Sequence, residues 1–230
     1  MDTDKWRFYG RRSGRKLNKT RQALLDDLYP KLQIDETSLD EAGTLDPSSL
    51  FDNPAKITLE IGFGNGEHLA EMMHRAPDES FIGAEPFING MTAFLKEMDE
   101  RDLDHNVRLL NDDAIPLVKS LTSASIDEIY ILNPDPWHKT RHHQRRIVNP
   151  KNLNLFARIL KPGARLIMST DVPDLIEWMI THSTRHDDFK WLANKADDWR
   201  VPPQDWIPTR YETKGAKGAD KMHYLFFERL

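Results

Sequence analysis

Short apolar runs alternate with amphipathic stretches from residue 57 onward, and this alternation constrains the fold more than any other feature of the chain. Five runs have the length and composition of strands buried on both faces: 57–61, 81–84, 107–110, 129–132 and 165–168. The stretches between them carry apolar residues at helical spacing, as in Met91, Phe94, Leu95 and Met98. This order predicts an α/β fold: a doubly wound, mostly parallel sheet with helices on both faces, closed by a last strand over 224–227.

The composition fits one core with appendages. At 230 residues and 39% hydrophobic content, the chain can bury a single substantial core. We expect a basic arm and an acidic linker over residues 1–54 and the main domain over residues 55–230. The absence of cysteine excludes disulfides, a thiol nucleophile and thiolate metal sites. No apolar run has the length that crosses a bilayer, so we expect a cytoplasmic protein without a membrane span or a secretory signal.

The charge is unevenly distributed. The formal net charge is -5, yet residues 5–21 carry eight basic side chains and no acidic one, with Trp6, Phe8 and Tyr9 among them. A basic arm with aromatic stacking groups favours a nucleic-acid partner, whereas the net charge alone would argue against one. A disordered solubilising terminus is the simpler alternative for this arm.

A glycine-rich segment follows the first predicted strand and precedes a predicted helix. Residues 60–67 read E-I-G-F-G-N-G-E, in which Gly62, Gly64 and Gly66 permit a sharp turn that brings a ligand close to the helix start. A dinucleotide site would carry a further glycine where this chain has Glu67, a carboxylate that repels a diphosphate. With Glu60 close by, the loop favours a cationic ligand such as S-adenosyl-L-methionine, which has a sulfonium and an ammonium group.

Acidic residues also follow the next three predicted strands. Glu85 closes the second strand, where a carboxylate accepts from both ribose hydroxyls of a nucleoside cofactor. Asp113 ends the third strand and is placed to accept from an adenine amino group, although its division of work with Asp112 stays open and a helix N-cap is the simpler role for either. Asp135 follows the fourth strand. Because this edge of an open α/β sheet binds ligands, we expect a cofactor site there.

The fourth predicted strand runs into a turn of unusual composition, I-L-N-P-D-P-W-H-K-T-R-H-H-Q-R-R-I-V-N-P over residues 131–150. Asp135 lies between Pro134 and Pro136, which restrict the backbone and hold the carboxylate in a narrow range of directions. We therefore predict a catalytic or ligand-orienting role for Asp135. Trp137 offers a stacking face to a base, and the residues that follow suit a phosphate backbone: Lys139, Arg141, Arg145 and Arg146, with His138, His142 and His143 among them.

Taken together, these motifs resemble the tRNA (guanine-N7-)-methyltransferase family. Five of them carry the resemblance: E-I-G-F-G-N-G-E (60–67), N-D-D-A (111–114), P-D-P-W-H-K-x-R-H-H-Q-R-R-I-V (134–148), S-T-D (169–171) and T-R-Y-E-x-K-G (209–215). The glycine motif is common to most class I methyltransferases, whereas the third and fifth blocks are specific. The resemblance implies that residues 55–230 form a Rossmann-like, seven-stranded class I methyltransferase domain. Its expected activity is methyl transfer from S-adenosyl-L-methionine to N7 of a guanine in the variable loop of tRNA.

The resemblance also implies roles for individual residues. The cofactor or the reaction centre is contacted by Glu60, Glu85, Asp113 and Asp135, with the three glycines at the turn. The substrate is contacted by Lys139, Asp171, Thr209, Arg210, Tyr211 and Glu212, and the RNA is held by Arg141, His142, His143, Gln144, Arg145 and Arg146. Asn133 and His138 depart from the family's pattern, which commonly has an aromatic residue and proline there. We expect tRNA as the partner and no obligate protein partner.

Other functions are weighed against this one. Residues 133–137 resemble the N-P-P-aromatic motif of amino-group methyltransferases with an extra Asp, which would misplace the stacking aromatic residue. An NAD oxidoreductase ranks lower because Glu67 spoils the dinucleotide pattern. A non-catalytic RNA-binding subunit is the alternative from a different class, and failure to bind S-adenosyl-L-methionine would support it. A metal site at His138 and His142 is disfavoured by the surrounding cations, and we predict none.

Overall fold

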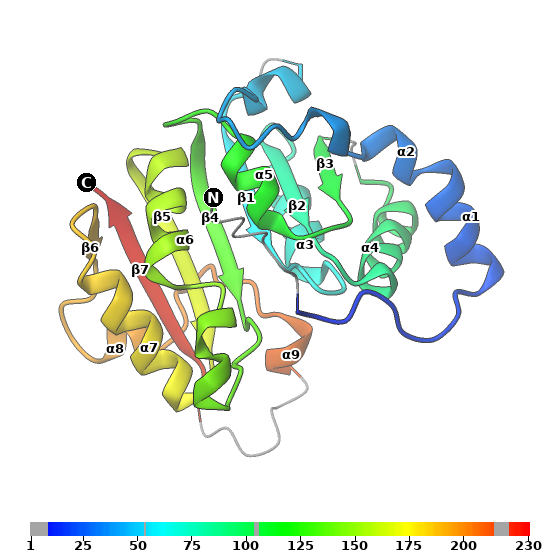
Figure 1. Cartoon of the computed structure of the whole chain (residues 1–230). Helices are drawn as coiled ribbons and strands as arrows, with labels where there is room; N and C mark the ends of the chain where they lie inside the picture. Colours follow the sequence, from blue (N-terminus) through cyan, green and yellow to red (C-terminus); the bar gives the residue numbers. More distant parts are fainter. Residues whose placement is uncertain (1–8, 53, 104–105, 214–220) are drawn as a thin grey trace.

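One seven-stranded sheet forms the centre of the molecule (Figure 1). The computed structural model describes residues 9–52, 54–103, 106–213 and 221–230. The sheet order is β3-β2-β1-β4-β5-β7-β6. Its strands are β1 Ile57–Ile61, β2 Ser80–Ala84, β3 Val107–Leu110, β4 Ile126–Leu132, β5 Leu160–Thr170, β6 Phe189–Trp191 and β7 His223–Arg229. All six predicted strands are confirmed, and β6 is the addition.

The sheet is parallel from β1 to β5 and antiparallel at β7. β1 pairs with both β2 and β4, so the chain reverses its direction of winding between these two neighbours. A crevice opens at such a switch point, outside the carboxyl ends of the strands. β7 starts at the same edge, because His223 pairs with Thr170 at the end of β5. The segment before β7 is thereby brought to the carboxyl edge.

Helices cover both faces of the sheet, as predicted. The helices are α1 Lys19–Asp27, α2 Tyr29–Leu32, α3 Glu67–Arg75, α4 Ile88–Arg101, α5 Ala114–Ser120, α6 Pro150–Ile159, α7 Pro173–Thr184, α8 Asp197–Arg200 and α9 Arg210–Thr213, with 3-10 turns η1 Glu36–Ser38, η2 Pro47–Leu50 and η3 Thr140–Arg145. One apolar cluster joins α3 and α4 to the sheet, and a second joins α5, α6 and α7 to it. The described residues include no helix long and apolar enough to cross a membrane.

The segment before the main domain is partly integrated into the core. Leu32 and Ile34 are 1% and 3% exposed, and Gln33 forms a parallel bridge with Leu109 of β3. Leu45 forms a similar bridge with Leu121, and α1 packs on α4. We expected residues 1–54 to be an arm and a linker. The structure shows that residues 32–34 of this segment belong to the packed body, because the apolar side chains of Leu32 and Ile34 are buried beside β3.

Candidate active site

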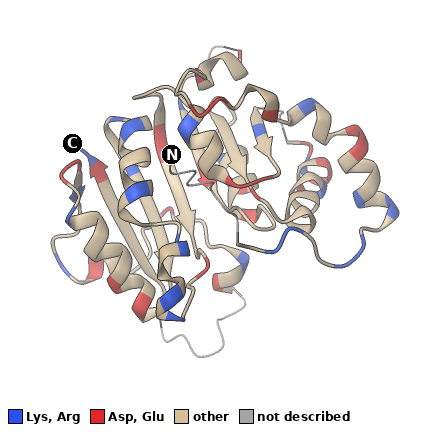
Figure 2. Ribbon diagram, in the orientation of Figure 1, with Lys and Arg blue, Asp and Glu red and all other residues tan. Residues whose placement is uncertain are grey.

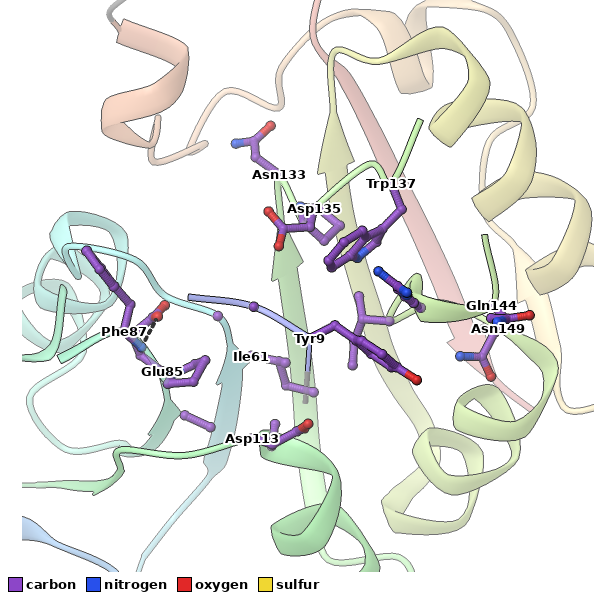
Figure 3. Close-up of a pocket in the computed structure, with 18 of the residues that line it drawn as sticks. Tyr9, Ile61, Glu85, Phe87, Asp113, Asn133, Asp135, Trp137, Gln144 and Asn149 are labelled. Carbon is purple, nitrogen blue, oxygen red and sulfur yellow. Dashed lines mark hydrogen bonds between the residues drawn. The ribbon is translucent and has the colours of Figure 1, made fainter. Parts of the chain in front are cut away.

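A cavity of about 1040 Å³ opens at the carboxyl edge of the sheet (Figure 3). The loops after β1, β2, β3 and β4 line it together with η3 and the start of α6. The N-terminal arm crosses between these parts, since Tyr9 contacts Arg145 and the Arg12 carbonyl accepts from the Ile88 N–H at 3.0 Å. Small-molecule sites usually measure roughly 300–1,000 Å³. The cavity therefore has room for a cofactor and for part of a second reactant.

The glycine loop leaves space where a ligand can lie against the backbone. Gly62 and Gly64 have φ of +73° and +61°, and a Cβ at either position would have no atom within 4 Å. Gly66 (φ +82°) is different, since its Cβ would lie 2.3 Å from the Phe94 ring. The first two glycines keep the loop open and the third permits close packing on α4. Gly62 lines the cavity, whereas Gly64 and Gly66 are not among its lining residues.

Glu85 is a buried carboxylate at the end of β2. It is 7% exposed and accepts hydrogen bonds from the backbone N–H groups of Gly64 and Phe87, both at 2.8 Å. Burial raises the pKa of Glu85 to about 7; the two backbone donors oppose this shift, while the charges of Asp135 and Glu60 add to it. A bound cation, or hydroxyl groups that donate hydrogen bonds, would offset the repulsion between these negative groups.

The two aspartates after β3 have separate contacts. Asp113 lines the cavity and caps α5, because its side chain accepts from the backbone N–H of Ile115 at 3.0 Å. Asp112 lies outside the cavity wall and forms an ion pair with Arg12 of the arm at 2.7 Å. Of the pair, only Asp113 is therefore placed to meet a ligand in the cavity.

Glu60 lies deeper than the other acids. It is 2% exposed, and its carboxylate oxygen is 2.9 Å from Nδ1 of His68, which is itself buried. Glu60 does not appear in the cavity wall, although its charge reaches Glu85. The structure therefore gives Glu60 an electrostatic influence on the site and places His68 between this carboxylate and Tyr130.

The turn that carries Asp135 is bracketed by two left-handed residues. Asn133 has φ +49° and Trp137 has φ +45°, conformations that non-glycine residues seldom adopt and that cluster at functional sites. Between them, Asp135 projects into the cavity (Figure 3), where loss of hydration raises the pKa of its carboxyl group above the usual value. The two prolines were expected to fix this acid. The structure adds the left-handed residues on either side.

The basic residues of η3 meet the N-terminal arm at the cavity mouth. The Arg145 guanidinium carbon lies 4.1 Å from the centroid of the Tyr9 ring and 5.1 Å from that of Trp137. His142 makes an edge contact with Trp137, with 5.9 Å between ring centroids. Loss of hydration and the neighbouring cations lower the pKa of His142. Together these side chains form a cationic and aromatic rim, to which exposed Lys139, Arg141 and Gln144 add polar groups.

Arg146 corrects one expectation for this stretch. We predicted an RNA contact, but Arg146 is 1% exposed. Its Nε donates to the Pro136 carbonyl at 2.9 Å, another nitrogen pairs with Asp174, and its guanidinium stacks on Trp178 at 4.9 Å. A guanidinium enclosed in this way cannot reach a phosphate in this conformation. Arg146 instead ties the end of the Asp135 turn to α7, and its neighbour Arg145 faces the rim.

The segment 209–212 reaches the same edge from the far end of the chain. Thr209 Oγ1 accepts from Asn133 Nδ2 at 3.1 Å. Loss of hydration and the nearby charge of Asp171 raise the pKa of Tyr211. Arg210 lies 3.5 Å from Glu67 at the start of α3. The structure thus brings the predicted substrate residues beside the Asp135 turn. Lys214 and Gly215, which complete the motif, lie outside the described residues, as does the arm before Tyr9.

Two parts of the cavity wall were missed at the sequence level. Tyr9, Gly10 and Arg11 line the cavity, whereas we expected the arm to contact RNA alone. Trp178 of α7 forms part of the opposite wall. An aromatic residue amid cations in the arm was a usable signal for Tyr9, but nothing in the helical spacing of α7 distinguishes Trp178 from a core residue. Within the described ranges, no cluster of three residues suited to hold a metal ion is found.

Comparison with known proteins agrees with this geometry. A family model described as "Putative methyltransferase" matches residues 54–225. The fold occurs in the 16S rRNA methyltransferase KamB (TM-score 0.57, 14% identity, 77% of this chain and 89% of that chain). It also occurs in a SAM-dependent O-methyltransferase from Thermotoga maritima (TM-score 0.51, 10% identity, 93% of this chain and 72% of that chain). Fold and site together define a Rossmann-like methyltransferase.

Closer relatives specify the family. The tRNA (guanine-N(7)-)-methyltransferase of Rhodospirillum rubrum is 40% identical over 228 residues, which cover 99% of this chain and 89% of that protein. The enzyme of the same name from Azorhizobium caulinodans is 42% identical over 224 residues, with 97% and 95% covered. The chain belongs to the tRNA (guanine-N(7)-)-methyltransferase family.

Proposed function

We propose that this protein transfers a methyl group from S-adenosyl-L-methionine to N7 of a guanine in the variable loop of tRNA, forming 7-methylguanosine. The observation that carries the proposal is the cavity itself, which has acidic groups on one wall and a cationic, aromatic rim on the other. The first wall suits a cationic nucleoside cofactor, and the second suits RNA. Relatives at 40–42% identity bear the name of this activity.

The acidic wall fits S-adenosyl-L-methionine. When bound, this cofactor supplies an electrophilic methyl group. Glu85 would accept from the ribose hydroxyls and Asp113 from the adenine amino group, while Gly62 leaves room for the ligand above the turn. Asp135 and the more distant Glu60 add the negative potential that favours a cation. A diphosphate would meet these same charges unfavourably.

Positioning and charge are sufficient for the chemistry. Guanine N7 carries a lone pair and no proton, so no group of the protein has to remove a proton before the methyl group is transferred. Positive charge develops on the purine as N7 is methylated. We assign to Asp135 the role of stabilising that charge. Its carboxylate is held in the cavity by a turn in which Asn133 and Trp137, on either side, have left-handed backbone conformations. Asp171 and the exposed residues of the segment 209–212, Arg210 and Tyr211, are proposed to contact the target nucleotide.

The rim is proposed to hold the RNA. The Arg145 guanidinium stacks on the rings of Tyr9 and Trp137. Arg141 and Lys139, from the same segment, are exposed. Further basic residues lie along the arm toward α1, as the blue segments of Figure 2 show. Contacts of this kind bind the phosphate backbone without reading sequence. Selection of the target guanine is therefore assigned to the cavity and not to the rim.

The proposal is tested by incubating the purified protein with methyl-labelled S-adenosyl-L-methionine and either unmodified bulk tRNA or ribosomal RNA. We expect label in tRNA only, and none with Asp135→Ala even though that variant still binds tRNA. Equal labelling by Asp135→Ala would remove its assigned role. Binding of tRNA by the native protein without any binding of the cofactor would support a non-catalytic RNA-binding subunit.

A further inference from the structure

Glu212 is fully engaged within the protein. One carboxylate oxygen accepts from the Trp206 indole N–H at 3.0 Å, and the other accepts from the Thr209 backbone N–H at 3.3 Å and the Thr209 hydroxyl at 3.1 Å. Burial, together with the nearby charge of this carboxylate, raises the pKa of Tyr224 to about 12. Glu212 is half-buried, whereas its neighbour Tyr211 is 48% exposed. The carboxylate therefore organises its own segment and is not directed at a ligand.

The direction of each hydrogen bond in this network is determined. An ionised carboxylate only accepts, so the Thr209 hydroxyl donates its proton to Glu212. The lone pairs of that hydroxyl are left to accept, and they do so from Asn133 Nδ2 at 3.1 Å. The amide NH2 group of Asn133 thus faces Thr209, which orients the whole carboxamide. A relay of side chains runs from Glu212 through Thr209 to Asn133, across 79 positions of sequence.

Asn133 is the point at which the relay meets the active-site turn. Its backbone has φ +49°, and its N–H donates to the Ser169 carbonyl at 2.9 Å. Pro134 and Asp135 follow directly, and the restricted backbone of Pro134 and Pro136 leaves little freedom between Asn133 and the Asp135 carboxylate. A side chain that fixes the conformation of Asn133 therefore also fixes the direction of Asp135.

We propose that Asn133 is a positioning residue for Asp135, and that Thr209 and Glu212 act through it. The kinetic part of this proposal rests on the proposed methyl transfer. The proposal also assigns two different roles to the residues of the predicted substrate segment 209–212. Arg210 and Tyr211 face outward and remain available to RNA, while the two residues that flank them hold the turn. Asn133 is also a position at which this chain departs from the motif of the family it resembles.

Kinetic measurements on four variants test the relay. Thr209→Val keeps the shape of threonine but removes the hydroxyl; Asn133→Gly removes the carboxamide and adopts φ +49° without strain. We expect each to lower kcat about tenfold at saturating tRNA, with the Kd for S-adenosyl-L-methionine within twofold of the native value. Thr209→Ser, which restores the hydroxyl, should return kcat to near the native value. The double variant should be no slower than the slower single variant.

Two results would overturn the proposal. If Thr209 contacts RNA directly, Thr209→Val should raise KM for tRNA and its effect should multiply with that of Asn133→Gly, giving about a hundredfold loss. A Thr209→Ser variant as slow as Thr209→Val would mean that the hydroxyl itself is unimportant. Thermal unfolding of each variant checks that the chain is folded in the assay.

A spectroscopic readout separates failure of the relay from failure of the proposed function. The chain has six tryptophans, whose indole N–H signals are resolved by 15N labelling. Trp206 lies at the Glu212 end of the relay and Trp137 lies just beyond Asp135, while Trp191 on β6 serves as the control. Thr209→Val should shift the signals of Trp206 and Trp137 and leave that of Trp191 in place. An unchanged Trp137 signal would overturn the relay even if the native protein transferred no methyl group.

Discussion

The two walls of the cavity are held in place by different means. On the wall proposed to bind the cofactor, Glu85 accepts two backbone N–H groups and Asp113 caps α5, so hydrogen bonds to the backbone fix the acids. On the wall proposed to bind RNA, Arg145 stacks on Trp137 of its own segment and on Tyr9 of the distant N-terminal arm. The placement of the acidic side chains can therefore be predicted from local sequence patterns, whereas the placement of Arg145 depends on tertiary contacts. The variants below separate these two cases.

Asp135, between the two walls, should show the largest effect on catalysis. We expect Asp135→Asn, which keeps the shape of the side chain but not its charge, to lower kcat by roughly 10²–10³ because stabilisation of the charge on the purine is lost. Its melting temperature should match that of the native protein, since Asp135 projects into the cavity. Single-turnover methyl transfer measures the rate. A rate within threefold of native would show that the negative charge is not required.

Arg146 and Arg145 form a matched pair that separates structure from RNA binding. Arg146→Ala removes the bond to the Pro136 carbonyl, the pair with Asp174 and the stacking on Trp178. We expect it to lower the free energy of unfolding by about 2–3 kcal/mol. Arg145→Ala should cost less, about 0.5–1 kcal/mol, because this half-buried side chain loses only its stacking on Tyr9 and Trp137. Denaturant unfolding measures both, and equal stabilities would contradict the buried role of Arg146.

Glu85 should make cofactor binding depend on pH. Only the ionised carboxylate accepts from both ribose hydroxyls, and burial raises its pKa to about 7. Affinity for S-adenosyl-L-methionine should therefore rise as pH increases from 6 to 8, by about tenfold, in line with the change in ionised fraction. Calorimetric titration measures it, and Glu85→Gln should bind weakly with no such rise. A pH-independent Kd for the native protein would refute this account of Glu85.

The raised pKa of Glu85 also makes the stability of the protein depend on pH, in the direction opposite to that of cofactor affinity. Because the pKa of Glu85 is raised on folding, the folded state holds a proton that the unfolded state has released between about pH 4.5 and 7. The contribution of Glu85 to stability of the cofactor-free protein therefore falls as pH rises through this window. Glu85→Gln should remove that decline. If the decline persists in the variant, another group is responsible for it.

The smallest effect is expected at the rim. Arg145→Ala should weaken tRNA binding about threefold to tenfold and reduce the slope of log affinity against log salt by about 0.7–0.9, the value for one phosphate contact. Lys190→Ala, on β6 away from the cavity, provides a control of equal charge change. Filter binding at several salt concentrations measures the slopes. Identical slopes for the two variants would place the RNA elsewhere.

The sequence predicted the fold and the edge of the sheet at which the acidic residues lie, for a physical reason. Strands such as 57–61 are buried on both faces and read as continuous apolar runs, and parallel strands deliver their following residues to one edge. β6 was missed because its three residues form no such run. Arg146 was predicted wrongly because charge pattern alone cannot distinguish a stacked, buried guanidinium from an exposed one. The contact between Asn133 and Thr209 joins segments that no local pattern connects.

Identification of the methylated product tests the central claim most directly. Unmodified tRNA is incubated with the native protein and labelled S-adenosyl-L-methionine, and the product is digested and analysed by mass spectrometry for the modified nucleoside and its position. We expect 7-methylguanosine in the variable loop. A methyl group on an exocyclic amine, or no methylated nucleoside despite tRNA binding, would contradict it.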